Sequence, residues 1–377
     1  MKKILVTSTD LMMLQFLVPH VLHLKDVGYD VEVVCSEVGG RFAEVETTLS
    51  GIKVRKVELY RSPLQPKNLK GLGELKKIIN SSHYDLIWTN EPVMGVMTRL
   101  AATKARKKGT KVVYMAHGFH FYDGAPRLNW MIYYPIEKLM ASRTDVIVTI
   151  NKEDYARAGG FKCADVRYIH GIGINTDRLT KTKEEKYLRQ ELGIGEDSFV
   201  VLSVGELNDN KNQAVVLDAL AKIKDPAIHY VLCGKGANMD TLKAKAATLG
   251  LSDNVHFLGY RKDVVDICSE ADVFVMPSKR EGLPVASLEA MYVGLPLITS
   301  RCRGIVDVME DGVTGYIHSY DDSDGITESI THLRDNTELR VTMGEENKHR
   351  VIPYCLKETK EEVLKIIVDI LGVIYAN

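Results

Sequence analysis

The amino-acid sequence predicts an α/β protein with two doubly wound parallel sheets in tandem. Short apolar runs rich in Val and Ile alternate with longer segments of helical periodicity along the whole chain. Continuous apolar runs are typical of parallel strands that are buried on both faces, and strand–helix alternation predicts that helices cover the sheet. The same scheme restarts in the second half, and 377 residues are enough for two domains with separate cores.

In the first half, apolar runs predict strands and periodic stretches predict helices. The strands are expected at Lys3–Ser8, Val31–Ser36, Val54–Leu59, Asp85–Asn90, Lys111–His117 and Asp145–Asn151. The helices are expected at Leu14–Val27, Leu69–Ser81, Val93–Lys107 and Trp130–Ser142.

The second half follows the same order. Strands are expected at Phe199–Gly205, His229–Gly234, Val255–Gly259, Val273–Ser278, Leu295–Ser300 and Gly315–Ser319, and helices at Gln213–Lys224, Asp240–Leu249 and Ile326–Arg334. The polar segment Thr176–Asp197 predicts the connection between the domains. We therefore expect an N-terminal domain of residues 1–175, a second domain of residues 176–356, and a terminal helix of about residues 357–375 that joins the first domain.

Charge and composition exclude several classes of protein. Lys and Arg number 49 against 50 Asp and Glu, a net charge of −1 that argues against nucleic-acid binding through bulk charge. No apolar run approaches the ~18 residues of a membrane-spanning helix, and the run after Lys2–Lys3 is too short for a signal peptide. The six cysteines show no Cys-x-x-Cys spacing, which fits a reduced environment. We expect a cytoplasmic globular enzyme.

The strongest candidate site follows the predicted strand Val273–Ser278. Ligands of open parallel sheets bind beyond the carboxyl ends of the strands. Here Glu281 and Gly282 lead into a helix that Pro284 can begin and that carries Glu289. Such a helix N-terminus can bind a phosphate. The eight-residue spacing separates the backbones of Glu281 and Glu289 by up to ~12 Å. The two catalytic carboxyl groups of glycosidases are closer, at ~5–9.5 Å from each other. The pair suits hydroxyls at two points of one extended ligand, although two unrelated surface acids explain the spacing equally well.

Two further loops after strands carry weaker signals. Lys211 follows the strand Phe199–Gly205 and can meet a phosphate as a point charge, although a solvated turn is the favoured interpretation of that loop alone. Gly234 and Gly236 lack the third glycine of a dinucleotide fingerprint, and residues 7–10 after the first strand contain no glycine. A nicotinamide dehydrogenase is therefore disfavoured.

His117 ends a predicted strand, and His120 follows three residues later. No Cys or carboxylate stands near them at a metal-ligand spacing, so we expect no metal site, and two such histidines are more often structural. Gly-x-Ser-x-Gly and His-Glu-x-x-His motifs are absent, so hydrolases of those types lack support.

Taken together, these residues resemble the family 4 retaining glycosyltransferases, which have the GT-B fold of two Rossmann-like domains facing a cleft. The most specific feature is the Glu-x7-Glu motif from Glu281 to Glu289, and the resemblance covers essentially the whole chain. Further similar segments are Val255–Arg261, Ala271–Ser278, His117–Phe121 and Thr149–Tyr155, the last two typical of a bacterial branch that builds capsule and exopolysaccharide.

The resemblance implies a donor site in the second domain. Glu289 would hold the ribose hydroxyls, Glu281 would meet the donor sugar and phosphates, and Lys211 would neutralise the departing diphosphate. The other donor-site residues implied are Gly205, Glu206, the backbone of Gly282 and Leu283, and the nucleobase border of Tyr260, Arg261 and Val264. The first domain becomes the acceptor side, with Asn90, Glu91 and His120, while His117 would lie beside the transferred sugar and complete a catalytic set with Lys211 and Glu281.

Two departures from the family pattern accompany this resemblance. Glu206 occupies the position of an arginine that usually precedes the lysine, which removes one cation and leaves Arg280 or Arg303 as substitutes. The glycine-rich loop after the first strand is also missing, which affects the usual contacts on the acceptor side.

The activity implied is transfer of a hexosyl or N-acetylhexosaminyl unit, with retention, from a nucleotide-diphosphate sugar. UDP is the commonest nucleotide of the family, and the implied acceptor is a glycan or lipid-linked glycan in surface polysaccharide synthesis. No cofactor or metal is expected, because a lysine and a helix N-terminus can stabilise a departing diphosphate.

Two alternatives share the fold: a non-hydrolysing sugar-nucleotide epimerase, and a non-catalytic partner subunit of a transferase. Separately, Lys104, Arg106, Lys107 and Lys108 are candidates for peripheral contact with the inner face of the membrane, although a solvated helix end is the favoured interpretation.

Overall fold

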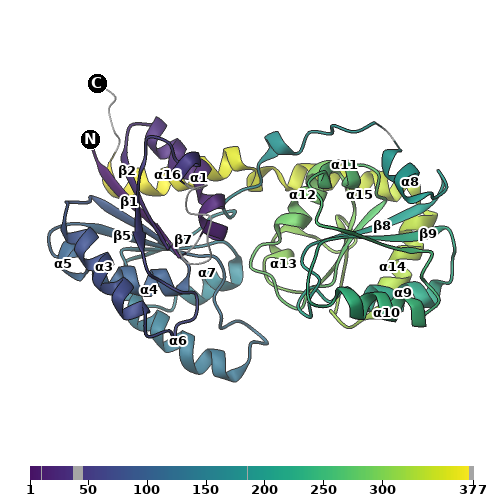
Figure 1. The fold of residues 1–377 in the computed structure, drawn as a ribbon, viewed down its shortest axis with the longest axis horizontal. Helices are drawn as coiled ribbons and strands as arrows, with labels where there is room; N and C mark the ends of the chain where they lie inside the picture. Colours follow the sequence, from purple (N-terminus) through teal and green to yellow (C-terminus); the bar gives the residue numbers. More distant parts are fainter. Residues whose placement is uncertain (10, 37–45, 185, 373–377) are drawn as a thin grey trace. The chain divides into compact units, whose positions relative to one another are not determined.

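The structure, a computed structural model, describes residues 1–9, 11–36, 46–184 and 186–372. The chain divides into two compact units (Figure 1). Unit 1 consists of Met1–Gly173 together with Leu356–Asn377, and unit 2 consists of Ile174–Cys355. The predicted class, two helix-covered parallel sheets, is confirmed in both units.

Unit 1 contains a parallel sheet whose seven described strands lie in the order β3-β2-β1-β4-β5-β6-β7. The strands are β1 (Lys3–Ser8), β2 (Asp30–Ser36), β3 (Lys53–Val57), β4 (Leu86–Asn90), β5 (Lys111–Ala116), β6 (Val146–Thr149) and β7 (Asp165–Tyr168). The helices are α1 (Leu11–Asp26), α3 (Asn68–Asn80), α4 (Pro92–Ala101), α5 (Thr103–Arg106), α6 (Arg127–Ala141), α7 (Lys152–Ala158) and α16 (Leu356–Leu371). In Figure 1, α1 and α16 lie together on one side of this sheet, and α3 and α4 lie on the other.

The central strands of unit 1 show why the apolar runs predicted strands correctly. All residues of β4 and all but the first of β1 and β5 are buried, because neighbouring strands and both helix layers cover them. Strand β7 was not predicted. Its four residues are only half-buried at the edge of the sheet, and two of them are charged, so they form no apolar run.

Unit 2 contains a second parallel sheet, with six described strands in the order β10-β9-β8-β11-β12-β13. The strands are β8 (Phe199–Val204), β9 (Ile228–Cys233), β10 (Val255–Gly259), β11 (Val273–Met276), β12 (Leu297–Ser300) and β13 (Gly315–His318). The helices are α8 (Tyr187–Leu192), α9 (Ala214–Ile223), α10 (Met239–Thr248), α11 (Val264–Cys268), α12 (Val285–Val293), α13 (Ile305–Val308), α14 (Ser323–Asp335) and α15 (Thr337–Arg350), with 3-10 turns η1 (Thr176–Arg178) and η2 (Ile352–Tyr354).

The segment Thr176–Asp197, expected to contain the connection between the domains, packs within unit 2. Leu188 of α8 is fully buried in the core of that unit. The carboxylate of Asp266 accepts hydrogen bonds from the backbone N–H groups of Thr182 and Lys183, at 2.6 and 2.7 Å. The chain passes between the units at Gly173–Ile174 and again at Cys355–Leu356.

The final helix, α16, is bound to unit 1 by three acidic side chains. Glu361 pairs with His23 at 3.2 Å, Glu362 with His170 at 2.6 Å, and Asp369 with Arg167 at 2.5 Å. The helix ends at Leu371, and the last residues of the predicted helix, 373–375, lie outside the described residues. None of the helices in the described chain is long and apolar enough to span a membrane.

The pH dependence of stability is expected to depend on His20, a buried residue of α1. Its Nε2 donates to the carbonyl of Ile172 at 2.8 Å, and burial lowers its pKa from 6.5 to about 4. Between pH 6.5 and about pH 4, His20 therefore binds a proton in the unfolded chain but not in the folded chain. The free energy of unfolding should fall as the pH drops from 6.5 toward 4, with this residue contributing at most about 1.4 kcal/mol per pH unit.

We expect His20→Gln to remove this contribution while keeping a donor for the Ile172 carbonyl. Urea unfolding of unit 1 between pH 4.5 and 6.5 measures the slope. The exposed His83→Gln exchange is the matched control and should leave the slope as it is in the original protein. An unchanged slope in His20→Gln would show that this histidine does not carry the effect.

Candidate functional site

In unit 2, the loops that follow the adjacent strands β8 and β11 are joined to each other. The backbone N–H of Lys279 donates to the carbonyl of Asn210 at 2.7 Å, and the Asn210 amide donates to the carbonyl of Arg280 at 3.0 Å. The Asn212 amide adds a bond to the carbonyl of Pro277 at 3.3 Å. Because β8 and β11 are neighbours in the sheet, their carboxyl ends bring the two predicted loops together.

These joined loops place Lys211 against Glu281. The Lys211 ammonium donates to a Glu281 carboxylate oxygen at 2.7 Å, and both side chains are largely but not completely buried, at 22% and 12% exposed. The Lys211 backbone N–H is fixed by the side chain of Asn208 at 2.9 Å. A cation and an acid predicted separately from the sequence thus form one contact that remains accessible to a ligand.

Helix α12 begins directly after this pair. Pro284 is its N-cap residue and makes no side-chain cap bond, and the first turn carries no acidic residue, so the N-terminus offers a positive dipole end. Arg303, which is 8% exposed, donates from Nε to the carbonyl of Glu281 at 3.3 Å. One of the two arginines considered as a substitute for the missing cation therefore lies against the Glu281 backbone, while Arg280 is exposed.

Glu289 lies one turn into α12 and is half-buried. Burial raises the pKa of its carboxyl above the usual value. Across the described residues, this carboxylate makes no hydrogen bond or ion pair. A desolvated acid without a protein partner is suited to accept hydrogen bonds from ligand hydroxyl groups.

The two glycines of Gly234-Lys235-Gly236 serve close packing of loops. A Cβ atom on Gly234 would lie 1.8 Å from the carbonyl oxygen of Gly205, and one on Gly236 would lie 2.1 Å from the carbonyl oxygen of Leu207. The Leu207 backbone N–H also donates to the carbonyl of Lys235 at 3.0 Å. These glycines therefore allow close packing against the β8 loop that carries Lys211. This packing explains why glycines occur at the spacing of a partial dinucleotide fingerprint.

The segment after β10 holds the other predicted donor-site residues. Tyr260 is 71% exposed, whereas Val264 packs against the core. The Arg261 guanidinium is paired with Glu191 at 2.6 Å and with Asp263 at 2.7 Å, which raises the pKa of the arginine and lowers that of Asp263 to about 2. Arg261 is thus neutralised by its neighbours, and Tyr260 is the more accessible residue of the segment.

Glu206, the residue at the usual arginine position, is exposed. Its carbonyl accepts a hydrogen bond from the Gln213 side chain at 3.0 Å, while its carboxylate makes no ion pair in the described parts of the chain. The structure therefore keeps the loop backbone in place but supplies no cation there.

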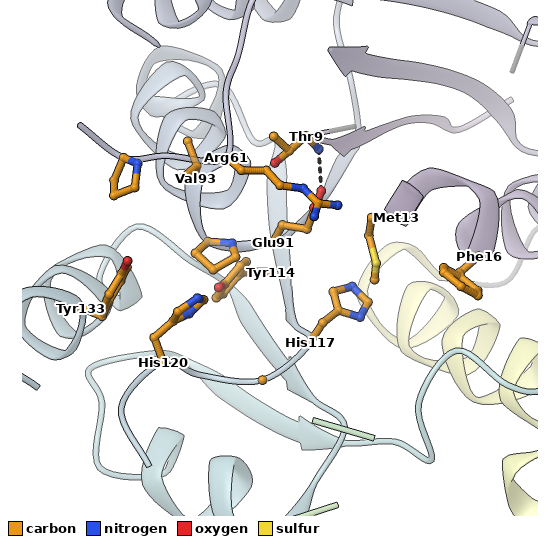
Figure 2. Close-up of a pocket in the computed structure, with 13 residues that line it drawn as sticks. Thr9, Met13, Phe16, Arg61, Glu91, Val93, Tyr114, His117, His120 and Tyr133 are labelled. Carbon is orange, nitrogen blue, oxygen red and sulfur yellow. Dashed lines mark hydrogen bonds between the residues drawn. The ribbon is translucent and has the colours of Figure 1, made fainter. Parts of the chain in front are cut away.

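In unit 1, a pocket of about 380 Å³ opens at the carboxyl ends of β1, β4 and β5 (Figure 2). Three residues that the sequence analysis selected line this pocket: Glu91, His117 and His120. Asn90 is not among the lining residues, but its side chain contacts His117. The remaining lining residues are Thr9, Met13, Phe16, Arg61, Pro63, Pro92, Val93, Tyr114, Gly118 and Tyr133. Arg61 and Tyr133 were not predicted, because Arg61 belongs to no motif and Tyr133 lies in the middle of a helix.

His117 is held in one orientation and in its neutral form. Its Nε2 lies 3.0 Å from the Asn90 carbonyl oxygen, and the Asn90 amide donates to the carbonyl of Thr7 at 3.2 Å. With this amide orientation Nε2 carries the proton, which leaves Nδ1 as an acceptor. Burial and the neighbouring His20 lower the pKa of His117 to about 4, so the ring is uncharged near neutral pH.

The Glu91 side chain is hydrogen-bonded to the end of β1, where the glycine-rich loop of the family is missing. Its Oε2 accepts from the Ser8 hydroxyl at 2.9 Å and from the backbone N–H of Thr9 at 2.5 Å, the bond drawn in Figure 2. The residue adopts φ of 65°, a strained conformation for a side chain other than glycine. Residue 10 lies outside the described residues.

Metal ligands are not assembled in the described chain. No group of three or more His, Cys, Asp or Glu side chains there has the arrangement to hold a metal ion. Lys211 and Glu281 belong to unit 2, and His117 belongs to unit 1, so the lysine–glutamate pair and the pocket each form within one unit.

Comparison with known proteins identifies the family. Residues 4–151 match the model of "Glycosyl transferase 4-like" proteins, and residues 184–350 match that of "Glycosyl transferases group 1". EpsD of Bacillus subtilis strain 168, named as a glycosyltransferase, is 38% identical over 373 residues, which cover 97% of this chain and 96% of EpsD. The chain belongs to the group 1 glycosyl transferases.

Two more distant relatives extend this comparison. The Escherichia coli protein named UDP-Gal:alpha-D-GlcNAc-diphosphoundecaprenol alpha-1,3-galactosyltransferase is 27% identical over 86% of this chain and 84% of its own. The structure of Anabaena Alr3699/HepE in complex with UDP and glucose superposes with a TM-score of 0.80 at 21% identity, over 98% of this chain and 100% of the other. The glycosyltransferase therefore has the predicted GT-B fold.

The packing of the β8 and β9 loops generates a prediction for this glycosyltransferase. A methyl group at Gly234 would displace the Gly205 backbone, so we expect Gly234→Ala to lower the free energy of unfolding by about 1–3 kcal/mol. Urea unfolding measures the loss. Gly73→Ala in α3 is the control, since a Cβ there meets nothing within 4 Å, and it should stabilise by about 0.5–1 kcal/mol. Equal effects of the two exchanges would contradict the proposed packing role.

Proposed function

We propose that this glycosyltransferase transfers a sugar, with retention of anomeric configuration, from a UDP-sugar to a lipid-linked glycan in surface polysaccharide synthesis. The observation that carries the proposal is the Lys211–Glu281 contact of 2.7 Å beside the uncapped N-terminus of α12. A nucleoside diphosphate leaves with growing negative charge, and a fixed ammonium group with a helix dipole stabilises that charge.

The donor would engage unit 2 at two points. Its diphosphate would compete with the Glu281 carboxylate for the Lys211 ammonium, which would release Glu281 toward the donor sugar. Glu289, half-buried and without a protein partner, would accept hydrogen bonds from the ribose hydroxyls. The UDP found in the Anabaena structure and the UDP-Gal in the name of the Escherichia coli relative support UDP as the nucleotide.

Retention is proposed on the resemblance to the retaining family, and the unit 1 pocket bears on the route by which it would occur. Glu91 is the only carboxylate in its described lining, and its Oε2 already accepts two hydrogen bonds. A double displacement needs a free carboxylate nucleophile, whereas attack on the face from which the diphosphate leaves needs none. The departing phosphate would then take the acceptor proton, while His117 Nδ1 would accept a hydrogen bond from a sugar hydroxyl.

The acceptor would bind in the unit 1 pocket. Its described lining combines apolar and aromatic residues with Arg61, which suits a ligand with both an anionic group and carbon-rich surface. The Escherichia coli relative is named for a diphosphoundecaprenol-linked acceptor. This name and the resemblance of the chain to exopolysaccharide enzymes support a lipid-linked glycan.

Replacing Lys211 by Ala tests the leaving-group role. We expect kcat to fall about 10²–10³-fold, because one preorganised charge opposite the departing diphosphate is lost. Lys245→Ala on α10 is the control. It also removes a lysine from an ion pair, here with Asp218, and should leave kcat unchanged. Sugar transfer from radiolabelled UDP-sugars is the measurement, and unchanged turnover in Lys211→Ala would refute the role.

Replacing Glu289 by Gln tests the ribose contact. We expect UDP to bind about 10-fold more weakly, since an amide accepts fewer and weaker hydrogen bonds from two hydroxyls than a carboxylate does. Calorimetric titration with UDP, in EDTA and in magnesium, measures the dissociation constant. Glu328→Gln, the same exchange on the exposed face of α14, should bind UDP like the original protein.

The same titration separates the proposal from its alternatives. Binding of UDP in EDTA supports a metal-independent nucleotide site, whereas binding of no nucleoside diphosphate supports a non-catalytic partner subunit. Incubation of the protein with UDP-sugars and no acceptor completes the comparison. Conversion to an epimer would identify an epimerase of the same fold.

A further inference from the structure

Helix α6 of unit 1 exposes an apolar stripe along its whole length. The stripe consists of Leu128, Met131, Ile132, Pro135, Ile136 and Leu139, which are spaced three, one, three, one and three residues apart. This spacing places all six on one face of the helix. Met131 is 73% exposed and Leu139 is 63% exposed, so side chains that normally form a core are in contact with solvent.

The opposite face of α6 is packed against unit 1. Met140 and Ala141 are buried, and Trp130 and Tyr134 pack on the buried Phe121. The stripe is therefore not needed for the internal packing of the helix. The described residues cover it only in part, since its two isoleucines, Ile132 and Ile136, are still 40% and 39% exposed.

The charges around the stripe are positive. Arg127 and Lys138 are exposed on α6, whereas the one acid of the helix, Glu137, is buried. Its carboxylate accepts from Arg99 at 2.8 Å and from the Tyr114 hydroxyl at 3.2 Å. The exposed face of α6 thus combines apolar side chains with cations and carries no acid.

The positive charge continues beyond the end of the helix. The Arg143 guanidinium donates to the Thr103 hydroxyl at 3.0 Å, which joins the C-terminal end of α6 to α5 and its following turn. That turn exposes Lys107 and Lys108, and Lys104 is exposed on α5. Three lysines of the basic cluster noted in the sequence are therefore exposed in the segment that Arg143 joins to the end of α6, whereas Arg106 is paired with Asp145 at 3.1 Å.

We propose that this face of α6 docks the glycosyltransferase on an anionic lipid bilayer. The apolar stripe would insert at the boundary between headgroups and acyl chains, and the flanking lysines and arginines would contact lipid phosphates. A second copy of the chain is a poorer occupant, because a two-fold contact through this face would oppose two sets of cations with no acid between them. The proposal rests on the lipid-linked acceptor of the proposed function.

The docking helix also forms a wall of the acceptor-side pocket. Tyr133 of α6 lines the pocket beside His120 (Figure 2). The two rings stack, with centroids 4.5 Å apart. Tyr133 lies on the same helix turn as Met131 and Ile132 of the stripe. Docking through α6 would therefore hold the pocket at the membrane surface, where a lipid-linked sugar is presented.

The test compares vesicle binding of the original protein with that of a Met131→Ser and Leu139→Ser double variant. Vesicles of phosphatidylcholine with 40% phosphatidylglycerol, and vesicles of phosphatidylcholine alone, are sedimented with each protein. We expect the original protein to bind the anionic vesicles at least about 10-fold more tightly than the neutral ones, and the double variant to lose about 10-fold in affinity. Val341→Ser in α15, an equally exposed apolar residue at 61%, should not change binding.

Two readouts keep this test separate from that of the proposed function. UDP binding and transfer to a soluble, short-chain acceptor should be unchanged in the double variant, whereas transfer to an acceptor embedded in anionic vesicles should fall. Loss of soluble transfer in the original protein would count against the proposed function instead. Vesicle binding that is the same in the double variant would overturn the α6 proposal, as would a dimer in light scattering that the double variant abolishes.

Discussion

The geometry of both sites depends on one constraint, the parallel direction of every described strand within each sheet. Residue Asn90 at the end of β4 is registered beside Met115 of β5, so the next residues along β5 bring His117 within 3.0 Å of the Asn90 amide. In unit 2 the pairing of β8 with β11 likewise places Lys211 against Glu281, although 70 residues separate them in sequence. Short loops after neighbouring strands need little additional structure to form a site.

The two sites differ in how charge is handled. In unit 2 a cation and an acid face each other at a helix N-terminus, and a second acid, Glu289, is left without a protein partner. In unit 1 the histidine is neutral and the one acid lining the described pocket is bonded to the β1 turn. Unit 2 is therefore suited to exchange of an anionic group. Unit 1 combines a neutral histidine, which suits hydroxyl groups, with the cation Arg61.

The sequence was most informative where burial leaves a pattern. Strands covered on both faces appear as apolar runs. The residues after them, including Lys211, Glu281 and His117, could be noted at strand ends, but only the family resemblance assigned them functional roles. Arg61 and Tyr133 could not be noted in this way, because their place in the pocket depends on how a loop and a helix pack in three dimensions. The apolar stripe of α6 was also hidden, since periodicity shows that a helix has apolar residues but does not show which face is covered.

Because α16 packs on α1, unit 2 is in effect inserted into unit 1 near its end. During synthesis on the ribosome, every residue of unit 2 has been added before the first residue of α16. Unit 2 can therefore complete its core from a contiguous stretch of chain, while the face of α1 that meets α16 stays uncovered. Helix α16 supplies the buried residues Val363, Ile366 and Ile367 last. Unit 1 is therefore the first unit to begin synthesis and the last to complete its core.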